Sequence, residues 1–469
     1  MRYPNDTIAA ISTPVGEGGI AVVRASGPDA IELVNGLFIQ DSALREAESH
    51  KAMVGYFREE PNGELIDQVV VTLFKGPNSY TGEDVVEIGC HGGRYLASLI
   101  LESVLNQGAR HAEPGEFTKR AFLNGRMDLS QAEAVADLIQ AKTRQSARYA
   151  MRQLQGGFSK KIEEIREELV NLLAHLELEL DFSEEGISLI SRDKLSLIVD
   201  QISNRMKAIG QTYRTGRLIH DGIKVIIVGK PNVGKSSLFN ALLGFERAIV
   251  DETPGTTRDA LEAHLDIGGT LFRLIDTAGV RETSGGIERK GIEITDSHLR
   301  EADLILFLLD LGTGFTDDDE TVRTRIERAV GAKEDDFAPS VLVLWNKSDL
   351  PKSIQSNGEL PNWRSFNISA LTGSGLLDLH KELSNYLVST TKGRENGPDG
   401  VITNLRHRMA VQKSLEYLGK AKESIKNEMS NEFIAIDIRD SLDALGEIIG
   451  KTTPEDVLNY IFDHFCIGK

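Results

Sequence analysis

The sequence predicts a multidomain α/β protein: an N-terminal α+β domain, then a discontinuous helical domain with a parallel-sheet α/β domain inserted into it. Three observations predict this arrangement. The length of 469 residues is enough for about three domains of ~150 residues each. Helical patterns occupy two separate stretches, 121–221 and 386–469. Between them, from 222 to 385, strands alternate with helices, which is typical of a parallel sheet covered by helices.

The N-terminal domain, residues 1–120, mixes strand and helix signals. GGIAVVRASG and DQVVVTLFKG are β-branched runs bounded by glycine, and each predicts a strand. RYLASLILESVLNQG has apolar residues at helical spacing and ends at glycine. In the helical part, QAEAVADLIQAKTRQSARYAMRQLQ and KKIEEIREELVNLLAHLELELDF are long and amphipathic. A polar, glycine-rich linker, TTKGRENGPDG, leads back into the second helical part, and such insertions are tolerated because domain termini usually lie close together.

The composition is that of an ordinary soluble protein, with 40% hydrophobic and 26% charged residues. No apolar run approaches the ~20 residues of a membrane helix, and MRYPNDTIAA has no signal-peptide pattern. Two cysteines cannot form a disulfide framework, and neither belongs to a CxxC pair, so we expect a reducing, cytoplasmic environment and no structural zinc. We also expect no association with a membrane. A net charge of −18 makes the whole chain a poor general binder of phosphate backbones.

The stretch IKVIIVGKPNVGKSSLFNALLG contains a phosphate-binding loop. GKPNVGKS, residues 229–236, fits G-x-x-x-x-G-K-[ST] between a predicted strand and a predicted helix, which is the confirming context. Gly229 and Gly234 let backbone N–H groups turn toward phosphate oxygens, and the helix adds its positive N-terminal end. Lys235 can reach the β- and γ-phosphates, and the Ser236 hydroxyl suits Mg²⁺. The loop residues expected at the nucleotide are Asn232, Val233, Gly234, Lys235, Ser236 and Ser237.

Three further motifs name the base and complete the nucleotide site. VLVLWNKSDL resembles the guanine-specificity motif of GTPases, with Asn346, Lys347 and Asp349 just after a buried strand. FNISALTG resembles the loop that closes over guanine, and FRLIDTAG places Asp276 at a strand end, where it can hold Mg²⁺ through water. These motifs contribute Ser369, Ala370, Leu371, Thr277, Ala278 and Gly279. Four motifs in this order predict that the chain binds GTP and GDP.

Hydrolysis needs a separate argument, because Val280 stands where many switch GTPases carry the glutamine that orients water. Either a partner or another residue of this chain must therefore act on the water. ETPGTTRD, residues 252–259, resembles a switch I segment, and Thr257 is expected to give Mg²⁺ its second hydroxyl. The amide of Asn232, with residues 251–256, could cage K⁺, whose charge would replace an arginine finger. The alternative for Asn232 is a turn residue without a ligand.

Taken together, these motifs resemble the MnmE (TrmE) family of tRNA-modification GTPases. Further matching stretches are DTIAAISTPVGEGGIAVVRASG, GPNSYTGEDVVEIGCHGG, PGEFTKRAFLNGRMDLSQAEAVADLI, ELELDFSEE, DTAGVRE and the terminal FCIGK. The resemblance covers essentially the whole chain. It implies a folate-binding N-terminal domain that dimerises, a split helical domain, and a Ras-like P-loop GTPase domain inserted in it. It also implies K⁺-dependent dimerisation of the GTPase domains, which activates hydrolysis without an external activator.

The resemblance assigns roles to individual residues of the GTPase domain. Its catalytic glutamate falls on Glu288; the alternative is a solvated switch II charge. Its potassium ligands fall on Asn232, Asp251, Thr253 and Thr256. The surrounding nucleotide-binding loop then comprises Asp251, Glu252, Thr253, Pro254, Gly255, Thr256 and Thr257.

The resemblance also implies a site for a tetrahydrofolate derivative, either 5-formyl- or methylene-tetrahydrofolate. This site falls on Arg24, Glu87, Arg126 and Lys469. A carboxylate such as Glu87 can pair with the amidine-like edge of a pteridine, and the cations suit the glutamate tail. Without the resemblance, surface ion pairs would be the simpler interpretation of the arginines.

In this family the partner is the FAD- and NADH-using protein MnmG, which forms a heterotetramer with the GTPase. Together they place a carboxymethylaminomethyl or aminomethyl group on C5 of the tRNA wobble uridine. One alternative is a switch-type or ribosome-assembly GTPase, which would carry an appended RNA-binding module instead of the N-terminal domain. Another is a stand-alone folate-dependent transferase, but the chain has no flavin signature, and that favours a partner.

Cys466, four positions from the end in FCIGK, has four interpretations: a prenylation site, a redox or metal thiol, a nucleophile, or a small buried residue. Prenylation is disfavoured because CIGK ends in lysine. The family tail points toward the folate pocket, so Cys466 is a candidate catalytic residue. Cys90 is expected to pack at a strand end, and His91 to be a structural or pocket histidine. Arg144, Arg148 and Arg152 share one helix face and either meet tRNA or are solvated.

Overall fold

The computed structural model divides into two compact units. The first comprises residues 1–136, 153–171 and 439–469, and the second comprises 137–152 and 172–438. The structure describes residues 6–14, 16–40, 43–182, 190–245, 248–249, 261–276, 296–332, 338–351, 360–390 and 401–469. At 245, 248–249, 261, 276 and 387–390 only the backbone is described.

The N-terminal part of the first unit is a seven-stranded sheet with the order β3-β4-β5-β6-β2-β1-β7, in which only the β1–β7 pair is parallel. Its strands are β1 (Ile8–Ile11), β2 (Ile20–Ser26), β3 (Phe38–Ile39), β4 (Lys51–Arg58), β5 (Leu65–Phe74), β6 (Val85–His91) and β7 (Arg110–His111). Because side chains alternate along a strand, Val23, Val71 and Ile88 face one buried core. Helices α1 (Ala30–Asn35) and α2 (Arg94–Asn106) add Val34 and Ile100 to that core.

The first unit also joins the N-terminal domain to the end of the chain. It also contains α3 (Glu116–Leu123), α4 (Leu129–Gln140), whose last four residues fall in the second unit, and α15 (Glu455–Asp463). Leu129 of α4 packs in one cluster with Leu458, Phe462 and Phe465. Apolar burial therefore fixes the C-terminal segment beside the start of the helical part.

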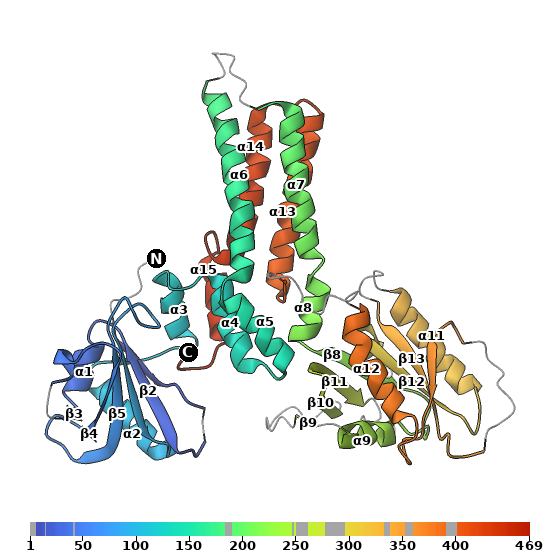
Figure 1. Ribbon diagram of the computed structural model, residues 1–469, viewed down its shortest axis with the longest axis horizontal. Coiled ribbons are helices and arrows are strands. Elements are labelled where there is room, and N and C mark those ends of the chain that lie inside the picture. Colours follow the sequence, from blue (N-terminus) through green and yellow to red (C-terminus); the bar gives the residue numbers. More distant parts are fainter. Residues whose placement is uncertain are drawn as a thin grey trace, which may run out of the picture. The chain divides into compact units, whose positions relative to one another are not determined.

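The second unit contains a pair of long helices, α7 (Arg192–Gly210) and α13 (Leu405–Lys426), which lie side by side although they are far apart in sequence (Figure 1). Leu195, Val199, Ile202 and Met206 recur every three or four residues and are buried, as an amphipathic helix requires. The other helices here are α5 (Arg144–Leu154), α6 (Gly157–Asp181), α8 (Tyr213–His220) and α14 (Asn431–Ile449), and the division between the units falls within α5, α6 and α14. The helical domain is therefore built from two separated parts of the chain, as predicted.

The inserted α/β domain has a seven-stranded sheet with the order β14-β13-β12-β8-β11-β10-β9. Its strands are β8 (Ile223–Val228), β9 (Ala248–Ile249), β10 (Leu261–Ile267), β11 (Thr270–Asp276), β12 (Leu304–Asp310), β13 (Ser340–Asn346) and β14 (Arg364–Asn367). From β14 to β11 neighbouring strands are parallel, and β10 pairs antiparallel with β11 and β9. Its described residues include the helices α9 (Lys235–Phe245), α11 (Asp317–Gly331) and α12 (Leu376–Thr390), and residues 296–301 are also helical.

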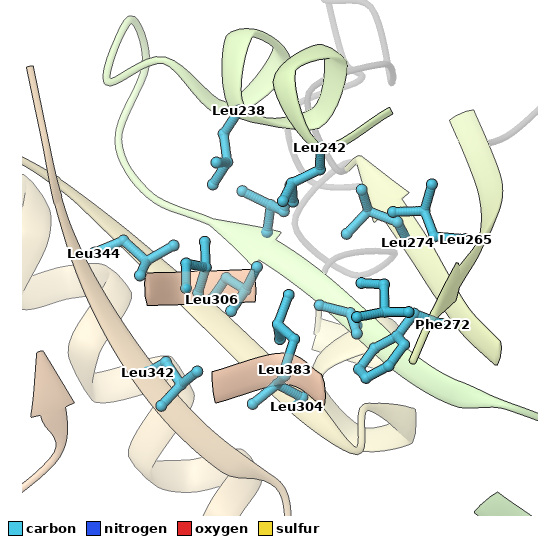
Figure 2. Packing of buried hydrophobic residues seen from close by; sticks show 14 of the residues in the cluster. Leu238, Leu242, Leu265, Phe272, Leu274, Leu304, Leu306, Leu342, Leu344 and Leu383 are labelled. Carbon is cyan, nitrogen blue, oxygen red and sulfur yellow. The ribbon is translucent and has the colours of Figure 1, made fainter. Parts of the chain in front are cut away.

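Helices cover both faces of this sheet, which explains why every residue of β12 is buried. On one face, Leu238 and Leu242 of α9 and Leu383 of α12 pack over Leu304 and Leu306 of β12 (Figure 2). On the other face, Ile326 and Ala329 of α11 pack against Phe307. The predicted fold class, with a Ras-like P-loop domain inserted into a split helical domain, is confirmed. Within the described part of the chain, no helix is long and apolar enough to span a membrane.

Candidate functional site

The phosphate-binding loop lies where the sequence predicts it, between the end of β8 and the start of α9. Gly234 has φ +104°, and a Cβ there would lie 2.4 Å from Nδ2 of Asn346. Both the backbone conformation and the close approach therefore require glycine at this position. Ser236 and Ser237 are exposed in the first turn of α9, where N–H groups and the helix dipole favour an anion.

Asn346 joins three of the predicted motifs. It ends β13, is buried, and donates from Nδ2 to the carbonyl of Val233 at 2.9 Å. Its Oδ1 accepts a hydrogen bond from the backbone N–H of Ala370, also at 2.9 Å. The phosphate-binding loop, the guanine-specificity motif and the loop of Ser369 are therefore tied to one side chain.

The two lysines of the nucleotide site already have partners. The Nζ of Lys235 donates to the carbonyls of Gly229 and Lys230, each at 2.9 Å. Lys347, with φ +63°, pairs with Oδ2 of Asp310 at 2.7 Å. Burial raises the pKa of Asp310, but the hydrogen bonds from Lys347 and the Gly312 amide outweigh it, so the pKa lies below its ordinary value. Asp310 therefore stays ionised and offsets the charge of Lys347.

Of the remaining predicted nucleotide residues, some lie in the described part of the chain and the others do not. Asp349 and Leu371 are exposed on the loops that follow β13 and β14. The backbone of Asp276 pairs with Ile227 of β8, beside the phosphate-binding loop. The others lie outside the described residues: Asp251, Glu252, Thr253, Pro254, Gly255, Thr256, Thr257, Thr277, Ala278, Gly279 and Glu288.

In the first unit, Arg24 and Glu87 are direct cross-strand partners on β2 and β6. Nε and Nη2 of Arg24 donate to Oε1 of Glu87 at 2.9 and 2.7 Å. The guanidinium lies 5.3 Å from the ring centroid of Tyr80 and 5.6 Å from that of Phe117. Among the described residues, Nη1 of Arg24 is buried and has no hydrogen-bond partner, which makes it a donor available to a ligand.

Lys469 lies near this pair. Burial and then the positive charge of Arg24 lower the pKa of Lys469, while the charge of Glu87 opposes the change. The exposed Arg126 lies beside Gly82, whose Cβ, if present, would be 3.3 Å from Cγ of Arg126. Arg24, Glu87 and Lys469 are thus within electrostatic reach of one another, whereas no hydrogen bond or ion pair joins Arg126 to them in the described part of the unit.

A buried ion network in the first unit was not predicted from the sequence. Arg120 of α3 is 1% exposed and pairs with Asp6 at 2.6 Å, Glu83 at 3.1 Å and Glu116 at 3.5 Å. Arg110 joins the same network through Asp6 and Glu116. The network connects β7, α3 and the loop before β6, and the sequence shows Glu116 and Arg120 only as part of the PGEFTKR motif, without indicating an ion pair.

The cysteines differ from each other. Both are free; Cys90 is 3% exposed on β6, as predicted, but Cys466 is exposed. The interpretation of Cys466 as a small buried residue is therefore wrong, because the neighbouring Phe465 fills the core instead. His91 is largely exposed, with Nδ1 at 2.7 Å from Asp67.

The three arginines of α5 are only partly alike. Arg144 and Arg148 are exposed, whereas Arg152 is half-buried and lies 6.0 Å from the Tyr149 ring centroid. Tyr149 itself packs against the core of the inserted domain. Two of the three guanidinium groups are therefore fully available to an external partner.

This fold and site define a P-loop GTP-binding protein whose nucleotide domain is inserted into a split helical domain. A family model described as "GTP-binding protein TrmE N-terminus" matches residues 7–126, and one described as "MnmE helical domain" matches 129–466. The chain is 42% identical over 473 residues to a "tRNA modification GTPase MnmE" of Alkaliphilus metalliredigens, covering 100% of both chains. Proteins of the same name from Carboxydothermus hydrogenoformans and Salinibacter ruber are each 43% identical, with 99% of each chain covered. The chain belongs to the MnmE (TrmE) family of tRNA modification GTPases.

Proposed function

We propose that this chain is a K⁺-dependent GTPase that acts with MnmG to form the carboxymethylaminomethyl or aminomethyl group on C5 of the tRNA wobble uridine. The observation that carries the proposal is the presence, in one chain, of the guanine-nucleotide motifs joined by Asn346 and of the Arg24–Glu87 pair with its available buried donor. The relatives' name, tRNA modification GTPase, supports the reaction class.

The nucleotide site suits Mg²⁺ and GTP. Lys235 donates to two carbonyls of its own loop, so its ammonium group lies where phosphate oxygens can replace them. Ser236 would supply a hydroxyl to Mg²⁺, with Thr257 as the second hydroxyl and Asp276 acting through water. Glu288 would orient or polarise the attacking water in place of the glutamine that Val280 replaces.

The K⁺ dependence rests on Asn232. Its φ of +59° is a conformation that asparagine tolerates, and the residue is exposed within the phosphate-binding loop. A carbonyl oxygen here, with Asp251, Thr253 and Thr256, would bind K⁺ next to the β- and γ-phosphates. Pairing of two nucleotide domains in a homodimer would close this site and activate hydrolysis.

The pocket around Arg24 suits a tetrahydrofolate derivative. The buried Nη1 of Arg24 is an available donor, and Glu87 can accept from the pteridine edge. Lys469 and Arg126 would pair with the glutamate tail of the ligand. When bound, 5-formyl- or methylene-tetrahydrofolate supplies the one-carbon unit that becomes attached to the uridine.

The sequence contains no flavin signature, so the flavin must come from a redox partner. We propose that this partner is the FAD-dependent MnmG. The two proteins would form a heterotetramer in the cytoplasm. A ribosome-assembly GTPase remains the alternative, but it would have no use for a folate pocket. A reconstituted reaction separates the two. It contains this chain, MnmG, FAD, NADH, GTP, K⁺, the folate and unmodified tRNA, and the product is measured by nucleoside mass spectrometry.

Two variants make this reconstitution diagnostic. Lys235→Ala should lose GTP hydrolysis, whereas Glu87→Gln should lose folate binding and keep GTP hydrolysis, and both should lose the modified nucleoside. A complete wild-type mixture that hydrolyses GTP but leaves the wobble uridine unchanged would refute the proposed function.

A further inference from the structure

Lys230 occupies a position that the phosphate-binding motif leaves unspecified, directly after Gly229. Its side chain is nonetheless only 13% exposed. The Nζ atom donates to Oγ1 of Thr313 and of Thr316, each at 3.1 Å, and to Oδ2 of Asp319 at 2.9 Å. Three donors thus meet three acceptors, which satisfies the ammonium group completely.

Asp319, the acceptor at the centre of this arrangement, has a side chain that is fully buried. Its Oδ2 also accepts from the N–H of Thr316 at 3.0 Å and from Oγ1 of Thr316 at 2.7 Å, forming a capping box at the start of α11. A cap alone does not require a buried charge, and a buried carboxylate is costly unless it is paired. Lys230 supplies a cation to this carboxylate from a loop 89 residues away in sequence.

The main chain of Lys230 is equally engaged. Its carbonyl accepts from Nζ of Lys235 at 2.9 Å, beside the carbonyl of Gly229, which accepts from the same atom. One residue therefore contacts α11 through its side chain and the phosphate-reaching lysine through its backbone. A change in the position of Lys230 would move the carbonyls that orient Lys235.

We propose that the Lys230–Asp319 ion pair positions the phosphate-binding loop for the nucleotide by fixing its first half to the N-terminus of α11. The loop is then ordered before the nucleotide arrives, so binding does not have to order it. Neither residue touches the reacting atoms; both act through the loop backbone and Lys235. Their loss should weaken nucleotide affinity while leaving the turnover rate at saturating GTP nearly unchanged.

The test measures the Kd for a fluorescent GDP analogue and both kcat and KM for GTP in the full-length protein. Lys230→Met keeps the length of the side chain but leaves Asp319 buried and unpaired, which alone would lower stability. The double variant Lys230→Met/Asp319→Asn removes both charges, and the amide oxygen can still accept from the Thr316 N–H at the start of α11. Circular dichroism melting fixes a temperature at which every variant is folded.

We expect both the single and the double variant to raise Kd and KM by about tenfold, the scale of one charge-assisted hydrogen bond, with kcat within about twofold. Lys230→Arg, which keeps the charge, should restore much of the affinity. Arg323→Met is the matched control, since Arg323 pairs with Glu320 and Glu327 of its own helix. This control should leave Kd unchanged.

Two results would overturn the proposal. Wild-type Kd values in both Lys230→Met and the double variant would mean that the pair only stabilises the fold. A raised Kd in the single variant with a normal Kd in the double variant would assign the effect to the unpaired Asp319 carboxylate instead.

Discussion

Gly468 lies directly against the backbone of Ile11. A Cβ at Gly468 would lie 2.4 Å from the Ile11 carbonyl oxygen, and the residue has φ +90°, which side chains rarely adopt. Ser12, which follows Ile11, donates from Oγ to the Gly468 carbonyl at 3.1 Å. The N–H of Gly115 bonds to the carbonyl of Cys466 at 3.4 Å. These contacts dock the C-terminal tail on the N-terminal sheet and bring Lys469 near Arg24.

The first prediction follows from this docking. Gly468→Ala should displace the tail, because backbone at Ile11 cannot yield to a methyl group, and Lys469 should leave the pocket. We expect the Kd for tetrahydrofolate, measured by calorimetry, to rise about tenfold, the scale of one charged hydrogen bond, with GTP hydrolysis unchanged. Gly108→Ala is the control, since Gly108 has φ +117° but open space around its Cβ position. If Gly468→Ala and Gly108→Ala bind tetrahydrofolate with equal affinity, the C-terminal tail does not contribute to the folate site.

The second prediction concerns Cys466, which is exposed and unpaired with another cysteine. Replacing it by alanine removes the thiol without opening a cavity, so any effect reports chemistry rather than packing. We expect Cys466→Ala and Cys466→Ser to lower the amount of modified wobble uridine while GTP hydrolysis and folate binding stay near normal. Full modification in the alanine variant would remove Cys466 from the catalytic residues.

The third prediction is cation dependence. GTP turnover should be fast in K⁺ and slow in Na⁺, because the smaller ion fits a cage of oxygen ligands poorly. Asn232→Gly is the sharpest variant, since glycine adopts the φ of +59° without strain and removes only the amide. It should turn over GTP at the same low rate in both salts. Equal rates for the wild-type protein in K⁺ and Na⁺ would contradict the proposed K⁺ site.

The fourth prediction concerns Glu288. Because Val280 cannot orient water, Glu288→Ala should lower kcat by about 10²-fold or more, the scale of general acid–base assistance, with nearly unchanged nucleotide affinity. Glu282→Ala, a change of the same type in the same segment, serves as the control and should hydrolyse GTP normally. A near-normal kcat in Glu288→Ala would return the role to an external activator.

The fifth prediction tests the α5 arginines. Changing Arg144, Arg148 and Arg152 to glutamate should weaken tRNA binding by the complex with MnmG. The salt dependence should also become less steep, by roughly one unit for each phosphate that is no longer neutralised. The control reverses three exposed lysines of α13, Lys413, Lys420 and Lys422, and changes net charge equally. If both variants show the same salt slope as the wild type, the arginines form a solvated face.

The sequence placed the phosphate-binding loop and Asn346 in the elements where the structure has them, because their motifs are contiguous and each has a local physical requirement. Gly234 and Lys235 stand where strand, loop and helix demand them, and Asn346 could be placed at the same edge of a parallel sheet. The sequence alone could not show that Asn346 hydrogen-bonds to Val233 and Ala370, since those contacts join loops far apart in the chain.

Residues whose role depends on distant partners were missed for the same reason. Lys230 and Asp319 belong to different elements, and each alone looks like a surface charge. Arg120 also appears as an ordinary cation in sequence, although it is buried among three carboxylates. Cysteine is usually buried, which favours a buried Cys466, but the aromatic residue before it, Phe465, occupies the core and Cys466 is exposed.

Nucleoside mass spectrometry of tRNA from a strain lacking this chain is the decisive measurement of whether it acts on the wobble uridine, as proposed. The deletion strain should lose the 5-carboxymethylaminomethyl or aminomethyl uridine, and the wild-type gene, but not the Lys235→Ala variant, should restore it. If the deletion strain keeps the modified wobble uridine at the wild-type level, this chain does not act in forming that modification.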